Sequence, residues 1–211
     1  MKGLRLTPEE RAGLRRQLHL EDAVPVLIAG STHPGETEIL LGAFRILRRK
    51  RPEVRLILAP RWLHEAPQIE KRFASEGFSV RRWTEMLQGV DGRGRYDVLM
   101  LDTFGDLNRL YGVADVAYIG SSLVPINMRR GGHNPLEALA HGVPVLFGPS
   151  MNLWRSVTAR LLDVWPGAEV RSEAALAEQA SQLLSGEAPL QTIRQEGNRL
   201  IEEASGAVER T

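Results

Sequence analysis

The sequence predicts an α/β fold, a Rossmann-like doubly wound parallel sheet of about six strands. Three observations support this prediction. Short apolar runs of the kind found in strands buried on both faces recur along the chain, segments with helical spacing of apolar residues alternate with them, and most of the apolar runs end in glycine or polar residues. Strands that alternate with helices imply right-handed crossovers, and therefore a parallel sheet with helices on its faces.

The predicted elements alternate regularly. Thr7, Pro8 and Glu10 occupy capping positions and predict the first helix. In chain order we expect a helix at 7–18, a strand at 24–30, a helix closed by RRKR at 48–51, a strand at 55–60, a helix at 63–75, a strand at 78–83, a flexible loop at 89–95, a strand at 97–102, a short helix in TFGDLNRLYG, a strand at 116–120, a helix opened by GGHNPLE, a strand at 144–149 and two helices within 172–211. The last helix, from about Leu190, has no stop signal, so we expect it to be cut short.

Composition limits the classes of function. The chain has 211 residues, enough for one domain with a sizeable core. A net charge of +1 and the lack of interleaved basic and aromatic residues argue against nucleic acid as a partner. Absence of cysteine excludes disulfides, thiolate nucleophiles and cysteine-based zinc sites. No apolar stretch approaches the ~20 residues of a membrane span, and the first residues lack a signal peptide's apolar middle, so we expect a soluble chain.

The stretch RGGHNPLEALAHGVPVLFGP, residues 130–149, contains a strong helix-start signal. Asn134 can serve as N-cap, Pro135 suits the first helical position, and Glu137 has the spacing of a capping box. The glycine pair at 131–132 would let the backbone approach a ligand, and the N–H groups of the first turn would offer an anion site. Considered alone, the segment is explained by a well-capped helix.

Polar or glycine-rich turns follow four of the predicted strands. Ligands of open parallel sheets bind outside the carboxyl ends of the strands, near the point where the strand order reverses. Capping accounts for the polar residues Thr32, Thr103 and Asn134, but not for an arginine at a strand exit or for glycines in three of the turns. Helix N-termini, an arginine and glycines at one edge are what a nucleotide phosphate needs. The turns are STHPGE after the first strand, Pro60-Arg61 after the second, residues 103–106 after the fourth and residues 130–137 after the fifth.

Other chemistries have less support. Neither a G-x-G-x-x-G fingerprint nor a Walker P-loop occurs, which disfavours dinucleotide redox chemistry and ATP hydrolysis. The five histidines show no metal-ligand spacing, so we expect no metal site and no cofactor. Glu36, Asp106 and Glu137 each fall in the first turn of a helix, where the helix dipole alone favours a carboxylate. We therefore predict no catalytic residue in this chain.

In their order and spacing, the motifs STHPGE, Pro60-Arg61, DTFGDLNRLYGVAD and RGGHNPLEALAHGVPVLFGP resemble the C-terminal, donor-binding half of the 3-deoxy-D-manno-octulosonic acid (Kdo) transferases. The resemblance implies a GT-B glycosyltransferase of lipopolysaccharide biosynthesis. Its C-terminal domain would hold the donor CMP-Kdo, and a missing N-terminal domain would hold the lipid A precursor and the catalytic base. The intact enzyme would work at the cytoplasmic face of the bacterial inner membrane, and this cytoplasmic half alone would be inactive.

The resemblance also implies which residues bind the donor and how the chain divides. It predicts a linker-proximal helix at 1–22, the donor-binding domain at 23–187 and a truncated C-terminal helix at 188–211. Phe104 and Asp106 stand where the family has methionine and glutamate. A GT-B transferase that uses a UDP-sugar and a stand-alone nucleotide-binding module remain alternatives. The predicted donor-binding residues are Ser31, Thr32, Pro60, Arg61, Thr103, Phe104, Gly105, Asp106, Gly132, His133, Asn134 and Glu137.

Overall fold

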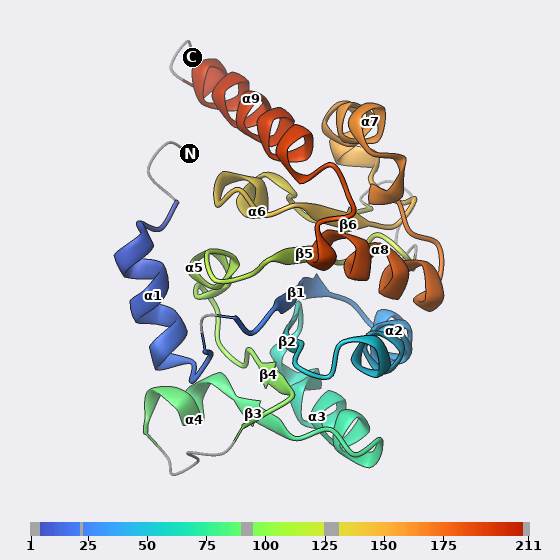
Figure 1. Cartoon of the computed structure of the whole chain (residues 1–211). Helices are drawn as coiled ribbons and strands as arrows, with labels where there is room; N and C mark the ends of the chain where they lie inside the picture. The colour runs from blue at the N-terminus through green and yellow to red at the C-terminus, as the bar shows by residue number, and fades with distance from the viewer. Residues whose placement is uncertain (1–4, 22, 90–94, 125–130, 209–211) are drawn as a thin grey trace.

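A single sheet of six parallel strands forms the centre of the protein, in the order β3-β4-β2-β1-β5-β6 (Figure 1). We describe residues 5–21, 23–89, 95–124 and 131–208 of this computed structural model. The predicted fold class and number of strands are confirmed. The strands are β1 (Val26–Thr32), β2 (Arg55–Pro60), β3 (Val80–Arg82), β4 (Val98–Met100), β5 (Val116–Ile119) and β6 (Val145–Phe147).

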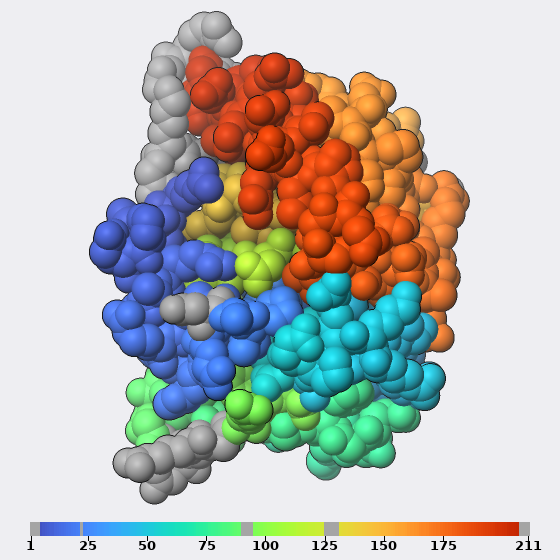
Figure 2. Space-filling view, in the orientation of Figure 1, coloured from blue at the N-terminus to red at the C-terminus, as the bar shows by residue number. Residues whose placement is uncertain are grey.

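Helices connect the strands and cover the sheet. α2 packs against α8, α8 also contacts β5 and β6, and α9 packs on α6 and α7. Figure 2 shows α2 in cyan and the end of the chain in red exposed on the same face of the molecule. The α-helices are α1 (Pro8–Gln17), α2 (Glu36–Lys50), α3 (Ala66–Ser75), α4 (Trp83–Leu87), α5 (Leu107–Tyr111), α6 (Leu136–Ala140), α7 (Arg155–Val164), α8 (Glu173–Ser185) and α9 (Leu190–Val208), and the 3-10 helices are η1 (Leu63–Glu65), η2 (Asn152–Trp154) and η3 (Pro166–Ala168).

α1 begins as its sequence predicts and packs near the amino-terminal ends of the strands. Thr7 and Glu10 form the expected capping box. The buried guanidinium of Arg15 donates to the carbonyl oxygens of Val113 and Val24, which lie shortly before β5 and β1. The opposite edge of the sheet, where the strands end, is left for the site.

The strand order reverses between β1 and β5. From β1 the chain adds β2 on one side, and it later returns to place β5 on the other side of β1. The residues of β5 are fully buried, as are Val26 and Ile28 of β1, so the reversal point lies over the best-packed part of the sheet. A rigid base of this kind fixes the loops that leave β1 and β5.

Three local predictions need correction. The strand predicted at 78–83 is only Val80–Arg82, because the Asp102 carboxylate accepts from the backbone N–H and the hydroxyl of Thr84 and draws the chain into α4. The helix predicted at 63–75 starts as the separate 3-10 turn η1. The sequence analysis did not identify α7. Most of the predicted 89–95 loop, and the segment Pro125–Arg130, lie outside the described residues.

Candidate donor site at the strand exits

A cavity of about 220 Å³ lies where β1, β2 and β4 end, beside the start of α6. The structure therefore brings three of the four predicted strand-exit motifs, together with Glu137 from the fourth, to one place. Among the predicted residues, Thr32, Asp106, Gly132, His133 and Asn134 do not line it but lie close by in the same loops. The lining residues are Ser31, Ala59, Pro60, Arg61, Leu101, Thr103, Phe104, Gly105, Leu107, Asn108 and Glu137.

The backbone is strained on both sides of the reversal point. Ser31 at the end of β1 has φ +55°, and Ser121 just after β5 has φ +60°, values that non-glycine residues adopt rarely. Gly120 lies between them, and a Cβ there would come within 2.3 Å of the Ser31 carbonyl oxygen. The two loops are thus pressed against each other, and Gly120 is the residue that permits it.

The loop containing GGHN is fixed to the end of β5 by its backbone. The N–H of Gly132 donates to the carbonyl of Ser121 (2.7 Å), and that of His133 donates to Gly120 (3.1 Å). Gly132 has φ +77°, and a Cβ on it would meet the sulfur of Met151. Glycine is therefore required here by conformation and by space.

The capping box predicted at Asn134 and Glu137 is not formed. α6 starts at Leu136 with Pro135 as its N-cap, and the Asn134 Oδ1 accepts from the Leu136 N–H (3.0 Å) in a local turn. The Glu137 carboxylate reaches the Asn134 side-chain amide at 3.4 Å rather than its backbone N–H. This turn at Asn134 places the helix start one residue later than expected, and Glu137 lies on the cavity wall.

Glu137 is a half-buried carboxylate with unused acceptor capacity. Burial raises its pKa, and the weak contact with Asn134 only partly offsets this effect. Tyr111 beneath it is fully buried, and burial together with the Glu137 charge raises the pKa of its phenol. A ligand that donates hydrogen bonds to Glu137 would relieve the cost of burying this charge.

The loop after β4 is held by Asp106. Its Oδ2 accepts from the Thr103 hydroxyl (2.6 Å) and from the Trp83 indole N–H (3.0 Å). Thr103 therefore does not cap α5, contrary to the capping explanation, and Thr32 does not cap α2, whose N-cap is Gly35. Within this loop Phe104 keeps 70% of its surface exposed, so an aromatic face is available to a ligand.

Arg61 supplies positive charge at the mouth of the cavity. Its backbone N–H donates to the carbonyl of Thr32 (2.8 Å), which joins the exits of β2 and β1. Its side chain is exposed and forms no ion pair within the part of the chain that the structure describes. The Arg61 charge helps to lower the pKa of both His33 and His133, so all three side chains share one electrostatic environment.

Two residues that the sequence analysis left out of the site are central to it. The Glu36 carboxylate is fully buried and accepts hydrogen bonds from the backbone N–H groups of His33, Ser121, Ser122 and Leu123 and from the Tyr118 hydroxyl. It ties the β1 exit to the β5 exit. His33 lies with its Nε2 2.9 Å from the Nε2 of His133. His33 belongs to the STH motif. The histidines were compared only for metal-ligand spacing along the chain, and that criterion does not detect a pair formed between two separate loops.

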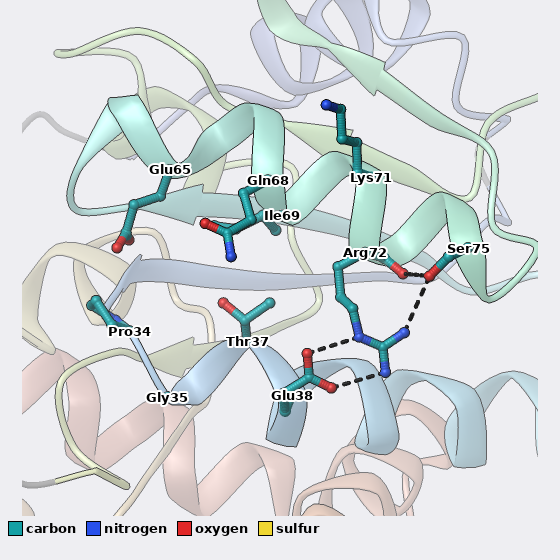
Figure 3. Close-up of a pocket in the computed structure, with 10 residues that line it drawn as sticks. All are labelled: Pro34, Gly35, Thr37, Glu38, Glu65, Gln68, Ile69, Lys71, Arg72 and Ser75. Atoms are coloured by element: carbon teal, nitrogen blue, oxygen red, sulfur yellow. Dashed lines mark hydrogen bonds and ion pairs between the residues drawn. The ribbon is translucent and has the colours of Figure 1, made fainter.

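A larger cavity of about 480 Å³ lies between α2 and α3 (Figure 3). Its arginine, Arg72, is already held by the Glu38 carboxylate at 2.8 and 2.9 Å and by Glu76 at 2.8 Å. Glu65 adds a further negative charge to the wall. Lys71 also lines this cavity, so its wall carries two acidic and two basic side chains; the smaller cavity differs in its arginine, Arg61, which no carboxylate of the described residues engages.

Two searches for other features of the described residues gave negative results. No group of three or more histidine and acidic side chains in the described ranges could hold a metal ion. No helix within those ranges is both long enough and apolar enough to cross a membrane.

Comparison with known proteins identifies the family. No family model matches the chain. The chain is 35% identical to the 3-deoxy-D-manno-octulosonic acid transferase of Aquifex aeolicus over 75% of its own length, and 34% identical to that of Haemophilus influenzae over 88%. It spans only 42% of either relative.

Solved structures agree on the fold. The C-terminal CMP-Kdo binding domain of WaaA from Acinetobacter baumannii superposes with a TM-score of 0.78 at 20% identity, over 92% of this chain and 96% of that one. WaaG, a glycosyltransferase involved in lipopolysaccharide biosynthesis, gives 0.62 at 12% identity over 96% of this chain and 50% of its own. The chain therefore belongs to the 3-deoxy-D-manno-octulosonic acid transferase family and has the fold of the C-terminal domain of a GT-B glycosyltransferase.

Proposed function

We propose that this chain is the donor-binding half of an enzyme that transfers Kdo from CMP-Kdo to a lipid A precursor. The observation that carries the proposal is the cavity at the strand exits, where an unpaired arginine and an under-satisfied carboxylate face a space of about 220 Å³. CMP-Kdo as the donor is supported by relatives at 34–35% identity that are named Kdo transferases and by the similar fold of a domain named as CMP-Kdo binding.

Each predicted residue has a role in this proposal. Arg61 faces the phosphate of the donor, Glu137 accepts from the ribose hydroxyls, and the exposed ring of Phe104 stacks on the base. Asp106 acts indirectly, because it already holds Thr103 and Trp83 and so sets the position of the Phe104 loop. The backbone around the cavity is shaped by Ser31, Thr32, Pro60, Gly105, Gly132 and Asn134, and the His133 ring lies within the influence of the Arg61 charge.

The acceptor side of the reaction belongs to the rest of the enzyme. We propose that a preceding domain, absent from this chain, holds the lipid A precursor and the catalytic base, so that residues 23–187 bind donor but do not turn it over alone. The intact protein would work at the cytoplasmic face of the inner membrane. Transfer would need no metal, because Arg61 supplies the positive charge beside the phosphate.

Nucleotide titration tests the assignment. CMP should bind this chain weakly by isothermal titration calorimetry, with the same affinity in EDTA and in millimolar Mg²⁺. UMP should bind more weakly and GMP more weakly still, because both differ from CMP in the base that faces Phe104. No response to millimolar CMP, or an equal response to GMP, would contradict the donor-site assignment. A stronger response to UMP would favour a UDP-sugar donor.

A further inference from the structure

The imidazole rings of His33 and His133 form a direct pair across the point where the strand order reverses. Their Nε2 atoms are 2.9 Å apart, and the rings are stacked at a centroid distance of 5.1 Å. His33 comes from the loop after β1 and His133 from the loop after β5. A hydrogen bond between two imidazole Nε2 atoms needs one proton, so one ring donates and the other accepts.

The surroundings of His33 decide which ring donates. The Nδ1 of His33 is buried, and no described group accepts from it or donates to it. If His33 carried its proton on Nδ1, a buried N–H would have no acceptor. Folded proteins avoid a buried donor without an acceptor more strictly than a buried acceptor without a donor. The proton of His33 therefore lies on Nε2, and His33 donates to His133.

The tautomer of His133 follows from that of His33. Because the Nε2 of His133 accepts, its own proton must lie on Nδ1. That Nδ1 is hydrogen-bonded to no described residue and is absent from the set of buried unpartnered atoms, so it remains accessible as a donor. The Arg61 backbone is hydrogen-bonded to Thr32, which precedes His33, so Arg61 lies beside the histidine pair and an anion drawn to its charge would approach His133.

We propose that His33 is a positioning residue of the donor site: it fixes His133 as the neutral Nδ1–H tautomer, so that His133 offers an N–H donor to the phosphate held by Arg61. The inference rests on the proposed function for the identity of the ligand. His33 itself touches no ligand in this scheme. Its contribution is to prevent the alternative tautomer, in which His133 would present a bare nitrogen to an anion and repel it.

The charged groups around the pair keep it neutral. His33 faces Glu36, Arg61 and Glu65, and it packs against the edge of Trp62, which in turn stacks on His64. His133 faces His33, Arg61 and Glu36. Burial is the main cause that lowers the pKa of both histidines, for His133 to about 4. Glu36 and Glu65 do not reverse this lowering of the pKa. The carboxylate of Glu36 already accepts hydrogen bonds from five other donors.

The first test reads the tautomer without any ligand. Ring ¹⁵N NMR of the 211-residue chain, labelled at histidine, should show His133 protonated at Nδ1 and His33 protonated at Nε2 at pH 7. His33→Gln keeps a donor near the Nε2 position and should leave His133 in the same tautomer. His33→Leu removes the donor and should release His133 to a mixture of tautomers. A free chain with His133 protonated at Nε2 would overturn the inference.

The second test measures binding of cytidine 5′-methyl phosphate, a diester whose phosphate does not titrate near neutral pH. Affinity should be constant between pH 6 and 8, with no proton uptake in buffers of different ionisation enthalpy. His33→Leu should weaken binding roughly two- to fivefold, because only the fraction of His133 in the Nδ1–H tautomer then binds the phosphate, and His33→Gln should restore most of the affinity. Thermal unfolding of both variants checks that they fold.

The outcomes separate this inference from the proposed function. An affinity that rises as pH falls, together with proton uptake, would mean that the histidine pair binds the phosphate as a cation. Equal binding by the wild type and His33→Leu would mean that His33 does not position His133. Either result overturns the inference and leaves the donor site intact. Failure of the wild-type chain to bind the diester would overturn the proposed function and, with it, the phosphate contact assigned to His133.

Discussion

The exits of β1 and β5 are built alike, yet their glutamates differ in how much of their hydrogen-bonding capacity is used. Each strand runs into a serine with positive φ, Ser31 or Ser121, and each loop carries a histidine and then a glutamate in the first turn of the next helix. Glu36 is fully buried and accepts five hydrogen bonds. Glu137 is half-buried with one long contact of 3.4 Å, and burial raises its pKa.

Hydrogen-bond satisfaction thus separates two carboxylates whose positions in their motifs are the same: Glu36 is fully satisfied and Glu137 is not. The five donors to Glu36 leave it little capacity for a ligand, so its charge serves to lock two loops together. Glu137 lies at the cavity wall and its charge is poorly compensated, and on that ground we propose it as the acceptor for the hydroxyl groups of a ligand.

Glu36→Gln should have the largest effect, and on stability. The glutamine NH₂ would face backbone N–H donors that the carboxylate now satisfies, so buried donors lose their acceptor. We expect a loss of about 3 kcal/mol or more in the free energy of unfolding, which corresponds to a fall in Tm of roughly 6–12 °C for a chain of this size. Thermal unfolding by circular dichroism measures it. Glu38→Gln, two residues along α2 in an exposed ion pair with Arg72, is the matched control and should change Tm little.

Arg61→Ala should weaken CMP by roughly tenfold to a hundredfold, because a charge-assisted contact to phosphate is lost. Cytidine, which lacks the phosphate, should bind the variant and the wild type alike. Calorimetry with both ligands gives the comparison. Arg72→Ala removes an arginine from the cavity between α2 and α3 and should leave CMP affinity unchanged; if the two variants behave oppositely, the phosphate lies in that larger cavity.

Glu137→Gln should weaken CMP by roughly tenfold while Tm shifts by only a few degrees. Neutral hydrogen bonds replace charge-assisted ones to the ribose hydroxyls, but no satisfied buried network is broken. The same calorimetry and unfolding experiments apply, and 2′,3′-dideoxy-CMP should bind the wild type and the variant equally. An unchanged CMP affinity would mean that Glu137 does not contact the nucleotide and that GGHNPLE serves only to start a helix.

The histidine pair should make stability depend on pH. The folded pKa of His133 is lowered to about 4 from an unfolded value near 6.5, so the unfolded state binds the proton first and the folded state loses stability as pH falls from 6.5 towards 4. Because the ring is partly exposed, we expect only about 1 kcal/mol, or roughly 2–4 °C in Tm. The Tm of the wild type should fall between pH 7 and pH 5, and in His133→Asn this fall should be smaller by the contribution of His133. An identical pH dependence in the variant would show that other groups cause it.

Phe104→Met should have the smallest effect. Both side chains are apolar and can cover a base, so we expect CMP affinity to change no more than about threefold, in favour of phenylalanine. Phe104→Ser should cost more, since it removes the apolar surface altogether. Calorimetry with CMP ranks the three proteins, and an order in which serine equals phenylalanine would place the base elsewhere.

The sequence was sufficient for the sheet and for the residues that meet at its edge. Apolar runs and helix-start signals predicted all six strands, since those patterns are local, and parallel topology then placed Ser31, Arg61, Phe104 and Glu137 together. The sequence was not sufficient to predict contacts between loops. Nothing local shows that Glu36 binds the backbone after β5, or that His33 meets His133, because both depend on how two separate exits pack. The capping box predicted at Asn134 and Glu137 was wrong because the Asn134 side chain accepts from the Leu136 N–H, and the helix then begins one residue later.

Amide chemical shifts recorded with and without CMP show directly whether the nucleotide occupies the small cavity at the strand exits. We expect millimolar CMP to perturb amides around the small cavity, at residues 31–33, 61–62, 103–106, 132–134 and 136–137, and to leave those of Gln68, Lys71 and Ser75 beside the larger cavity unmoved. Perturbations confined to the wall between α2 and α3, or no perturbation at all, would contradict this expectation.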